Sequence, residues 1–487
     1  MLKPRRFVVV ALSAAGVTVL TQALAFFRQL LVAAYFGVSR DLDIYVIAYT
    51  VAMMFVFSFA ITFDSAVVPR LIQARETGGE RAAHALAVSV FRWSCVLSAL
   101  ATIALVALTP LLAPLVATGF DASQKADLSR LVWFFAPWTF LCLPYYAASA
   151  RHKAKRNFNR VFRAEIVICI VSIAVLFFFH DEVALLPWAY AAGYGSGLLS
   201  LLFGAGLLGR GHGMNADGTG AALRNVGELY LANQSGSLGS IVDRHFQSLV
   251  PAGGIAAVNY SSQLITGIIG LLAFREIYIV PLAEADRREE KLERLIIGLL
   301  LLAIPAAAFT ASFAHDIVKM LFERGRFDAA ATDLTASLLR IYAFVLIPSM
   351  IGSPLARMLQ IVGRTNLIHL VYLSNAIAIA MFGTLFVVWL RLDTQGIAWM
   401  LLTAATLSTT VTAGLVARTG LLVRWARVAR YAFFAMVVAA VATGLGLEMA
   451  SQFNGAVMRL IMGGATFGIV IGSAYFVVRR RLLTISG

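Results

Sequence analysis

The sequence contains little charge for its length. Only 13% of its 487 residues are Asp, Glu, Lys or Arg, whereas 60% are hydrophobic and the mean hydropathy is +0.83. Soluble proteins carry about a quarter charged residues, so the composition excludes an ordinary soluble enzyme or binding domain. Apolar runs of about 20 residues, long enough to cross a bilayer as helices, recur along the whole chain. We therefore expect an all-α polytopic membrane protein.

The motifs of common enzymes are also absent. The sequence contains no GxxxxGK[ST] phosphate loop, no HExxH zinc motif, no CxxC pair and no GxSxG nucleophile elbow. Its three cysteines, Cys95, Cys142 and Cys169, lie in apolar runs and predict buried thiols, not a disulfide framework. No loop is long enough to form a catalytic domain. We predict a transporter with no cofactor, driven by the membrane potential, by H⁺ or Na⁺, or by its substrate's own gradient.

The apolar runs predict fourteen transmembrane spans. They are 7–36, 44–69, 85–113, 131–150, 161–180, 185–208, 227–250, 254–283, 295–314, 334–356, 366–390, 394–417, 428–449 and 456–478. The span at 227–250 is too polar to face lipid, so we expect it to line a cavity or to pack inside the bundle. Most Trp residues, Trp138 among them, suit the aromatic belts at the membrane interfaces. Gly193, Gly195 and Gly197 predict close helix packing.

The placement of the positive charges predicts the topology. With the N-terminus inside, most of the 40 Lys and Arg residues fall in segments predicted to be cytoplasmic. This is the positive-inside pattern, and it predicts that both termini are cytoplasmic. The net charge of +15 then reflects topology and contact with the lipid bilayer. Nucleic acid is not an expected partner.

Two halves of the chain resemble each other. Arg28 and Gly37 match Arg244 and Gly253 in spacing. Further matches follow in the same order: Asp43 with Asn259, VVPRL (67–71) with IVPLA (279–283), GFDASQKADL (119–128) with RFDAAATDL (326–334), and residues 143–144 with 347–348. We predict parallel six-helix lobes at 1–210 and 225–418, related by a pseudo-two-fold axis. Two additional helices and a basic tail follow at 427–487.

Charged and amide side chains inside four spans form the candidate site. The substrate-binding candidates are Arg28, Asp43, Asn233, Asp243, Arg244, Asn259, Gln263, Arg275 and Glu276, with Asp64, Gln234, His245 and Tyr260 nearby in the same spans. Intramembrane charges are costly and usually mark transport pathways. One interpretation is a water-filled chamber between the halves, where guanidinium groups bind a phosphate-bearing headgroup. The alternative is structural neutralisation within Arg28–Asp43, Asp243–Arg244 and Arg275–Glu276.

Four segments together resemble a known family. They are FFRQLLVAAYFGVSRDLDIYVIAY, VVPRL, VDRHFQSLVPAGGIAAVNYSSQL and LFERGRFDAAATDLTA. They are similar to the MurJ/MviN lipid II flippases of the multidrug/oligosaccharidyl-lipid/polysaccharide exporter superfamily. The resemblance implies two lobes around a central cavity, alternating access in the bacterial inner membrane, and an undecaprenyl-pyrophosphate-linked glycan as cargo. It also implies that the two additional helices form a groove for the lipid tail. We expect a monomer.

The resemblance carries over only part of the family's site. Arg28, Asp43 and Asp243 match an arginine and two acidic residues of the family's cavity. Gln22 and Gln263 stand where the family has arginines, and so does the uncharged stretch at 55–56. Arg275 and Glu276 have no counterpart in the family pattern. The predicted site is therefore less cationic, and the cargo is either lipid II or another lipid-linked glycan, such as an exopolysaccharide repeat unit.

Two other function classes are compatible with the sequence. A cation-coupled multidrug or small-molecule exporter of the same superfamily would use the acidic residues for Na⁺ or H⁺ and the arginines structurally. A membrane-embedded glycosyltransferase or ligase would need an outward loop with acid–base residues, and HDIVKMLFERGRFDAAATD is the only candidate. The flippase explains more of the pattern than either alternative does.

Overall fold

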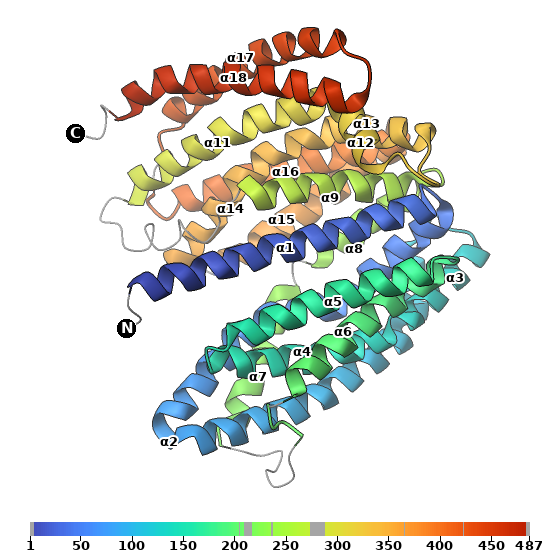
Figure 1. Ribbon diagram of the computed structural model, residues 1–487, viewed down its shortest axis with the longest axis vertical. Helices are drawn as coiled ribbons and strands as arrows, with labels where there is room; N and C mark the ends of the chain where they lie inside the picture. Colours follow the sequence, from blue (N-terminus) through green and yellow to red (C-terminus); the bar gives the residue numbers. More distant parts are fainter. Residues whose placement is uncertain are drawn as a thin grey trace. The chain divides into compact units, whose positions relative to one another are not determined.

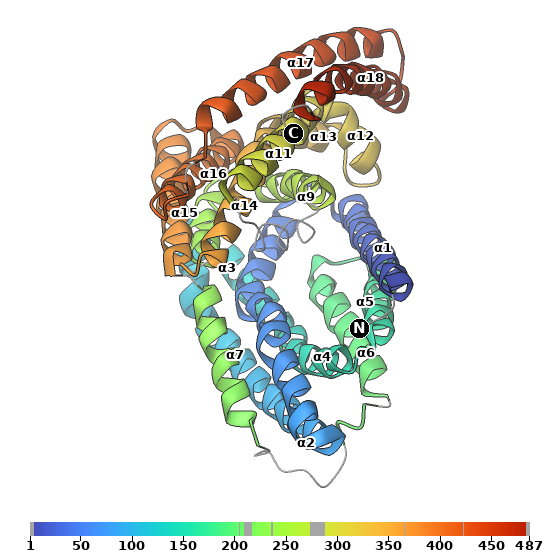
Figure 2. The same ribbon diagram turned by 90° about the vertical axis from the view of Figure 1, so that its left-hand side faces the viewer.

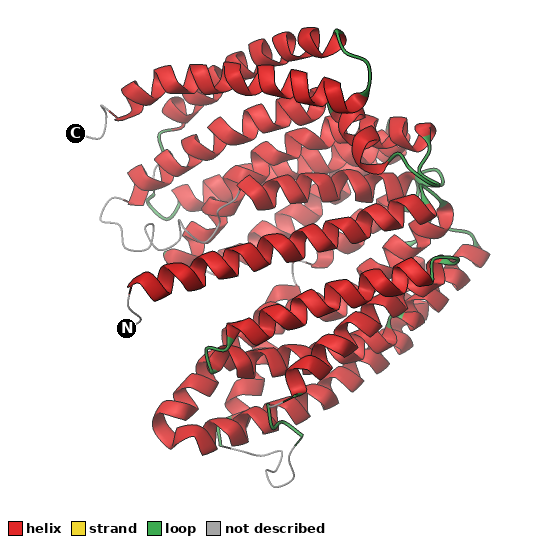
Figure 3. Ribbon diagram, in the orientation of Figure 1, coloured by secondary structure: helices red, strands yellow, loops and turns green. Residues whose placement is uncertain are grey.

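The computed structural model describes residues 4–203, 205–208, 217–234, 237–272, 288–364, 366–421 and 423–483. Every regular element in these ranges is helical (Figure 3), which confirms the all-α prediction. Ten helices within the same ranges are long and apolar enough to cross a membrane. The chain divides into two compact units, Met1–Ser237 and Leu238–Gly487, and each is described by itself.

The first unit contains seven α-helices and one 3₁₀ turn among its described residues. They are α1 (Pro4–Phe36), α2 (Arg40–Val116), α3 (Ala122–Phe134), α4 (Ala136–Ala154), α5 (Phe158–Phe178), η1 (Val183–Leu185), α6 (Leu186–Leu202) and α7 (Thr219–Gln234). Helix α2 packs along α4 and α7, α6 packs between α4 and α5, and α1 lies against α5 (Figures 1 and 2). Buried apolar side chains of α2, α4, α6 and α7 form its main core.

Helix α2 passes through two predicted spans, 44–69 and 85–113, and the connection between them is itself helical. The helix starts at a cap in which the Ser39 hydroxyl accepts a hydrogen bond from the Leu42 backbone N–H at 3.3 Å. Only at Gly79 do the dihedral angles leave the helical range, with φ 74° and ψ −171°. Glycine adopts positive φ at no steric cost, so Gly79 redirects α2 between the two spans.

Small residues set the approach of α5 to α6. A Cβ atom built on Gly193 would lie 2.8 Å from the Ile168 carbonyl oxygen, and one on Gly197 would lie 2.5 Å from a side-chain carbon of Ile168. Lipid-embedded helices associate mainly by such close packing, because lipid is as apolar as their surfaces. The predicted role in packing is therefore confirmed for Gly193 and Gly197.

The second unit continues from α8 to the end of the described chain. Its elements are α8 (Ser237–Gln247), α9 (Gly254–Leu272), α11 (Arg288–Ser312), α12 (Ala314–Phe322), α13 (Ala329–Tyr342), the 3₁₀ turn η2 (Ala343–Val345), α14 (Leu346–Ile361), α15 (Asn366–Gly383), the π-helical turn η3 (Thr384–Trp389), α16 (Asp393–Ala417), α17 (Trp425–Ser451) and α18 (Ala456–Leu483). Helix α11 packs against α14 and α17, and α16 packs against α14 and α15.

Helices α17 and α18 form a hairpin (Figure 2). Two ion pairs join it to the rest of the second unit. Arg427 of α17 bonds to Glu293 of α11 at 3.2 Å, and Arg459 of α18 lies 3.4 Å from Asp316 of α12. Both carboxylates are almost fully buried. Because a buried charge without a partner is costly, these pairs specify where the hairpin docks.

The internal repeat has local counterparts in the two units. Gly37 and Gly253 both have positive φ, 60° and 82°. Asp121 and Asp328 are both helix N-caps, accepting hydrogen bonds from the backbone N–H groups of Gln124 and Ala331 at 2.8 Å. The matched sequence positions therefore mark equivalent chain turns in each unit, and the lobe boundaries at 210 and 225 stay a prediction.

Candidate functional site

Arg28 is the best-defined charged group of the candidate site. It lies on α1, and its Nη2 donates a hydrogen bond to the hydroxyl of Tyr190 on α6 at 2.9 Å. The guanidinium carbon also stacks over the Tyr190 ring, 4.3 Å from its centroid. A single tyrosine thus supplies both a hydroxyl acceptor and a cation–π contact, which places a partly buried cation in a defined orientation.

Tyr190 also packs against a cluster of aromatic rings. The Tyr190 ring lies 5.2 Å from Trp138 and 5.4 Å from Tyr49, centroid to centroid. Phe135 and Tyr45 extend the cluster: the Phe135 ring lies 5.8 Å from Tyr45 and 5.9 Å from Tyr49. Since Trp138 is only 2% exposed, its prediction as an interfacial residue is wrong. The cluster fixes Tyr190, which in turn fixes Arg28.

Asp43 pairs with Arg40, a residue of its own helix. Its carboxylate is fully buried in the first turns of α2, 3.5 Å from the guanidinium of Arg40. Arg40 also lies over the Phe120 ring, 5.2 Å from the centroid. A helix N-terminus stabilises a negative charge, so Asp43 is held by its own helix and by Arg40.

Asp243 and Arg244 are joined through a third residue in the second unit. The Gln247 amide nitrogen donates to the Asp243 carboxylate at 2.8 Å, while Arg244 donates to the Gln247 amide oxygen. All three lie on α8, and Gln247 is almost fully buried. This arrangement supports the structural interpretation of the Asp243–Arg244 pair, because the nitrogen and the oxygen of the Gln247 amide each bind one of the two charged groups.

The remaining predicted residues are less well constrained. Asn259 and Gln263 lie on α9 and are partly buried. Asn233 belongs to α7, and Arg275 and Glu276 lie outside the described residues. Asp64 forms an ion pair with Lys153 of α4 at 2.7 Å. Within the described part of the chain, no group of three or more His, Cys, Asp or Glu could hold a metal ion.

Sequence reasoning missed the residues that hold the candidate charges. Tyr190, Arg40 and Gln247 each contact a predicted residue, yet none stands out in an apolar or amphipathic run. One signal was present for Tyr190: AYAAGYGSG places Tyr190 and Tyr194 four residues apart, on one face of a helix. The glycines of the same segment favour the interpretation as a packing surface.

Comparisons with known proteins agree with the fold. The family model described as "Lipid II flippase MurJ" matches residues 32–466. The probable lipid II flippase MurJ of Buchnera aphidicola subsp. Acyrthosiphon pisum (strain APS) is 24% identical over 359 residues, covering 69% of this chain and 70% of the relative.

Two solved structures extend the comparison. A lipid II flippase MurJ in an inward closed conformation gives a TM-score of 0.77 at 17% identity, covering 96% of this chain and 99% of the other. A MATE-family multidrug resistance transporter of the MOP superfamily, in an inward-facing conformation, gives 0.65 at 15% identity, covering 84% and 95%. At such identities, both similarities describe the fold.

Proposed function

Because this chain belongs to the MurJ family of lipid II flippases, we propose that it moves a polyprenyl-pyrophosphate-linked saccharide across the bacterial inner membrane by alternating access. It is a multi-pass membrane transporter, a flippase of a lipid-linked glycan, and not an enzyme. The cargo is amphipathic: its tail is compatible with lipid, whereas its pyrophosphate and sugars are not. The protein must therefore offer the headgroup a polar route.

The observation that carries the proposal is the fixed guanidinium of Arg28. A guanidinium has five N–H donors in a planar fork that matches phosphate oxygens. Among the described residues, the hydrogen bond to Tyr190 uses one of these donors. The stacking on the Tyr190 ring orients the fork without using the rest. Arg28 is thus prepared to bind a pyrophosphate at low entropic cost.

The other candidate residues have supporting roles in this proposal. Arg244 donates one N–H group to the amide oxygen of Gln247, and the carboxylate of Asp243 offsets its charge. Asn233, Asn259 and Gln263 supply neutral donors and acceptors that suit sugar hydroxyls. We assign Asp43, Arg275 and Glu276 to the same headgroup pathway. Gln22 and Gln263 stand at positions that are cationic in the family pattern, so we propose that this site binds phosphate more weakly. The cargo is then lipid II or an exopolysaccharide repeat unit.

The test compares two arginines that both stack on aromatic rings. Arg28 of α1 stacks on Tyr190, whereas Arg130, an exposed residue of α3, stacks on Phe134 of the same helix at 5.6 Å. With purified protein in vesicles, Arg28→Ala should lower the flipping rate of a fluorescent polyprenyl-pyrophosphate glycan about ten- to a hundredfold, the value of hydrogen bonds to a charged group. Arg130→Ala should leave the rate unchanged. Full flipping activity in a folded Arg28→Ala protein would remove Arg28 from the site.

The identity of the glycan needs a separate experiment. Expression in a strain depleted of its own lipid II flippase should restore growth if the cargo is lipid II. Failure to restore growth, with normal amounts of protein in the membrane, would favour an exopolysaccharide unit. The same vesicle assay with each glycan then distinguishes the two cargoes directly.

A cation-coupled exporter is the second candidate function. The observation in its favour is the fold shared with the MATE-family transporter. Asp43, a fully buried acidic residue, would then bind Na⁺ or H⁺. Under this alternative, Asp43→Asn would abolish export of a cationic drug, and Arg28→Ala would retain it. The flippase proposal expects the opposite dependence on Arg28.

The remaining aspects of the proposal concern the whole chain. We propose cytoplasmic N- and C-termini, a monomer, and moving bodies that correspond to the lobes 1–210 and 225–418, with 427–487 as additional helices. Transport is driven by the membrane potential or by an H⁺ or Na⁺ gradient, because the sequence contains no recognisable nucleotide-hydrolysing motif.

A further inference from the structure

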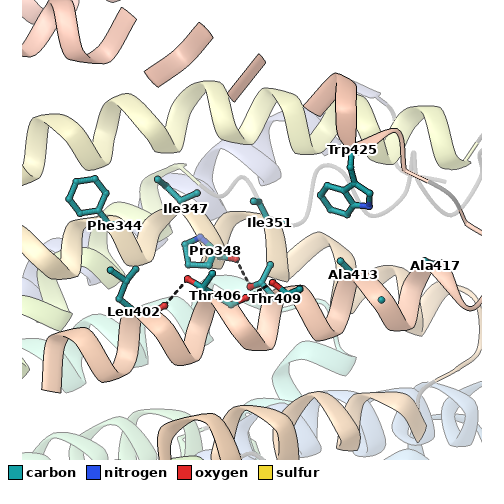
Figure 4. A pocket seen from close by; sticks show the side chains of 12 residues that line it. Phe344, Ile347, Pro348, Ile351, Leu402, Thr406, Thr409, Ala413, Ala417 and Trp425 are labelled. Atoms are coloured by element: carbon teal, nitrogen blue, oxygen red, sulfur yellow. Dashed lines mark hydrogen bonds between the residues drawn. The ribbon is translucent and has the colours of Figure 1, made fainter. Parts of the chain in front are cut away.

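An apolar groove runs along the second unit between α14 and α16 and ends at the start of α17 (Figure 4). Its volume is about 670 Å³. Phe344 and Leu402 line one end, and Ala417 and Trp425 line the other (Figure 4). Along its wall, the close contact between Gly352 and Thr409 brings α14 and α16 together. The groove lies within one compact unit and outside the candidate site.

The three threonine hydroxyls in the groove wall donate their hydrogen bonds to backbone carbonyls. Thr409 donates a hydrogen bond to the carbonyl of Pro348 at 3.0 Å, and Thr406 donates to Leu402 at 2.8 Å (Figure 4). Thr410 donates to the carbonyl of Thr406 at 2.9 Å. With its hydroxyls turned to backbone carbonyls, the wall presents methyl groups and apolar side chains. Such a surface favours a hydrocarbon occupant over a polar one.

The size of the groove limits the length of that hydrocarbon. A water-sized group takes up roughly 30 Å³ of liquid, so the groove offers room for about 20 such groups. This is the scale of one fatty acyl chain. A full undecaprenyl tail is far longer, so the groove is too small for the tail of the proposed cargo.

Positive charge lies at one end of the groove. Arg418 directly follows the lining residue Ala417, and Arg424 directly precedes Trp425; both arginines are exposed. Within the described part of the chain, neither forms an ion pair, whereas the nearby Arg427 is paired with Glu293. Trp425 is 41% exposed, as expected for a tryptophan at a membrane interface. A guanidinium binds phosphate oxygens well, and two exposed arginines adjoin the lining residues at this end.

We propose that this groove binds one acyl chain of an anionic phospholipid, whose phosphate lies at Arg418 and Arg424. The apolar wall accommodates the chain, and the two arginines select a negative headgroup. Both arginines are on the face predicted to be cytoplasmic, where anionic lipids attract basic residues. The site is distinct from the cargo pathway and would hold a resident lipid against the second unit.

Trp425 offers a direct measurement, because bromine atoms on an acyl chain quench a nearby indole. The protein is reconstituted in vesicles containing brominated phosphatidylglycerol or brominated phosphatidylcholine, without cargo. The emission of Trp425 is obtained by subtracting the fluorescence of the Trp425→Phe protein from that of the wild-type protein. We expect half-maximal quenching at a mole fraction of phosphatidylglycerol at least threefold lower than that of phosphatidylcholine.

Two variants separate headgroup selection from contact with bulk lipid. Arg418→Ala/Arg424→Ala should remove the preference for phosphatidylglycerol, whereas Arg81→Ala/Arg163→Ala, with two exposed arginines in the first unit, should retain it. Ala413→Phe should fill part of the groove without adding an indole, and it should reduce the quenching of Trp425 by both lipids. Because the double arginine change alters only exposed side chains, it stays informative even if Ala413→Phe does not fold.

Other outcomes would overturn the proposal. Equal quenching by both lipids in the wild-type protein would mean unselective contact with surrounding lipid. Relief of quenching by undecaprenyl phosphate, but not by unlabelled phosphatidylglycerol, would assign the groove to the cargo tail. Absence of quenching at Trp425 would mean that no lipid chain enters the groove. Since no cargo is present, these results do not depend on the proposed transport function.

Discussion

Arg28 shows how a single residue can carry a charge inside an apolar span. A central arginine costs about 2.5–3.5 kcal/mol on the insertion scale. A desolvated cation–π contact returns up to about 2 kcal/mol, and a hydrogen bond to a charged group returns about 1.5–3 kcal/mol. Tyr190 supplies both contacts. Together they are of the size needed to hold the guanidinium in place without a carboxylate.

The hydroxyl of Tyr190 should matter for cargo affinity. Tyr190→Phe removes the hydrogen bond to Arg28 and keeps the ring, so the guanidinium loses part of its orientation. We expect the half-saturating cargo concentration to rise about two- to tenfold, which is less than the full value of a hydrogen bond to a charged group, because the remaining ring still orients the guanidinium. The maximal flipping rate should change little. Flipping measured in vesicles over a range of cargo concentrations gives both values.

Tyr145, which in the described part of the chain is linked to the cluster only through the contact of Tyr194 with Trp138, provides the control. Tyr145 packs against Tyr194 at 5.3 Å, and its buried hydroxyl has no hydrogen-bond partner among the described residues. Tyr145→Phe should therefore leave the half-saturating concentration unchanged. An equal effect of the two substitutions would mean that the cluster has a general packing role and does not position Arg28.

At the residue scale, the charges were predictable and their partners were not. Arg28, Asp43 and Asp243 stand out because charge is rare in apolar runs. Their contacts with Tyr190, Arg40 and Gln247 depend on where helices meet and on which rotamers fit. Tyrosine is also common at interfaces and in bundles, so its presence alone does not identify a partner.

At the scale of elements, close backbone contact organises the α17–α18 hairpin. A Cβ on Gly446 of α17 would lie 3.0 Å from the Gly463 carbonyl oxygen on α18. At the same point, Gly463 also faces the ring of Phe313, which lies between α11 and α12. The two helices therefore meet each other, and α18 meets Phe313, with no room for an added methyl group.

Gly463→Ala should destabilise the second unit. The new Cβ would lie 2.5 Å from the Phe313 ring and 2.9 Å from the Gly446 carbonyl oxygen. Overpacking of this kind costs about 1–3 kcal/mol, which thermal unfolding of the detergent-solubilised protein would detect as a lower Tm. Gly468→Ala, on the same helix with no atom within 4 Å of the added Cβ, should leave Tm unchanged or slightly raise it. Equal Tm values for both variants would contradict the close contact.

The course of α2 shows what element-level prediction misses. The apolar runs at 44–69 and 85–113 were found, and both are helical. The segment between them contains Gly78, Gly79 and several charges, a composition typical of a loop. The structure keeps it helical on both sides of Gly79, because Glu, Arg, Ala and Gln are strong helix formers. Composition alone does not show which of two adjacent glycines adopts positive φ.

At the scale of the whole molecule, the distribution of arginine and lysine predicts orientation. A green fluorescent protein fused to the C-terminus should fluoresce, because that reporter folds in the cytoplasm, and an alkaline phosphatase fused there should be inactive. The matched control is the same pair of fusions after Arg391, between two predicted spans on the opposite side. The two reporters should then exchange their activities. Activity of the phosphatase at the C-terminus would reverse the predicted topology.

The class of the fold follows from simple properties of the sequence. Apolar runs specify helices in a bilayer, because a backbone without water must satisfy its own hydrogen bonds. Repeated signals such as Asp121 and Asp328 predict equivalent turns, and both are N-caps. The α14–α16 groove could not be predicted, because it arises where the close contact of Gly352 with Thr409 leaves unfilled space beside it.

The contact between Arg28 and Tyr190 joins positions 162 residues apart in the chain. It therefore links the evolutionary histories of α1 and α6. A relative that loses the tyrosine leaves its arginine without an acceptor, and a relative that loses the arginine has no use for the hydroxyl. We expect the two positions to co-vary, so that tyrosine at 190 is inherited together with arginine at 28 and lost together with it.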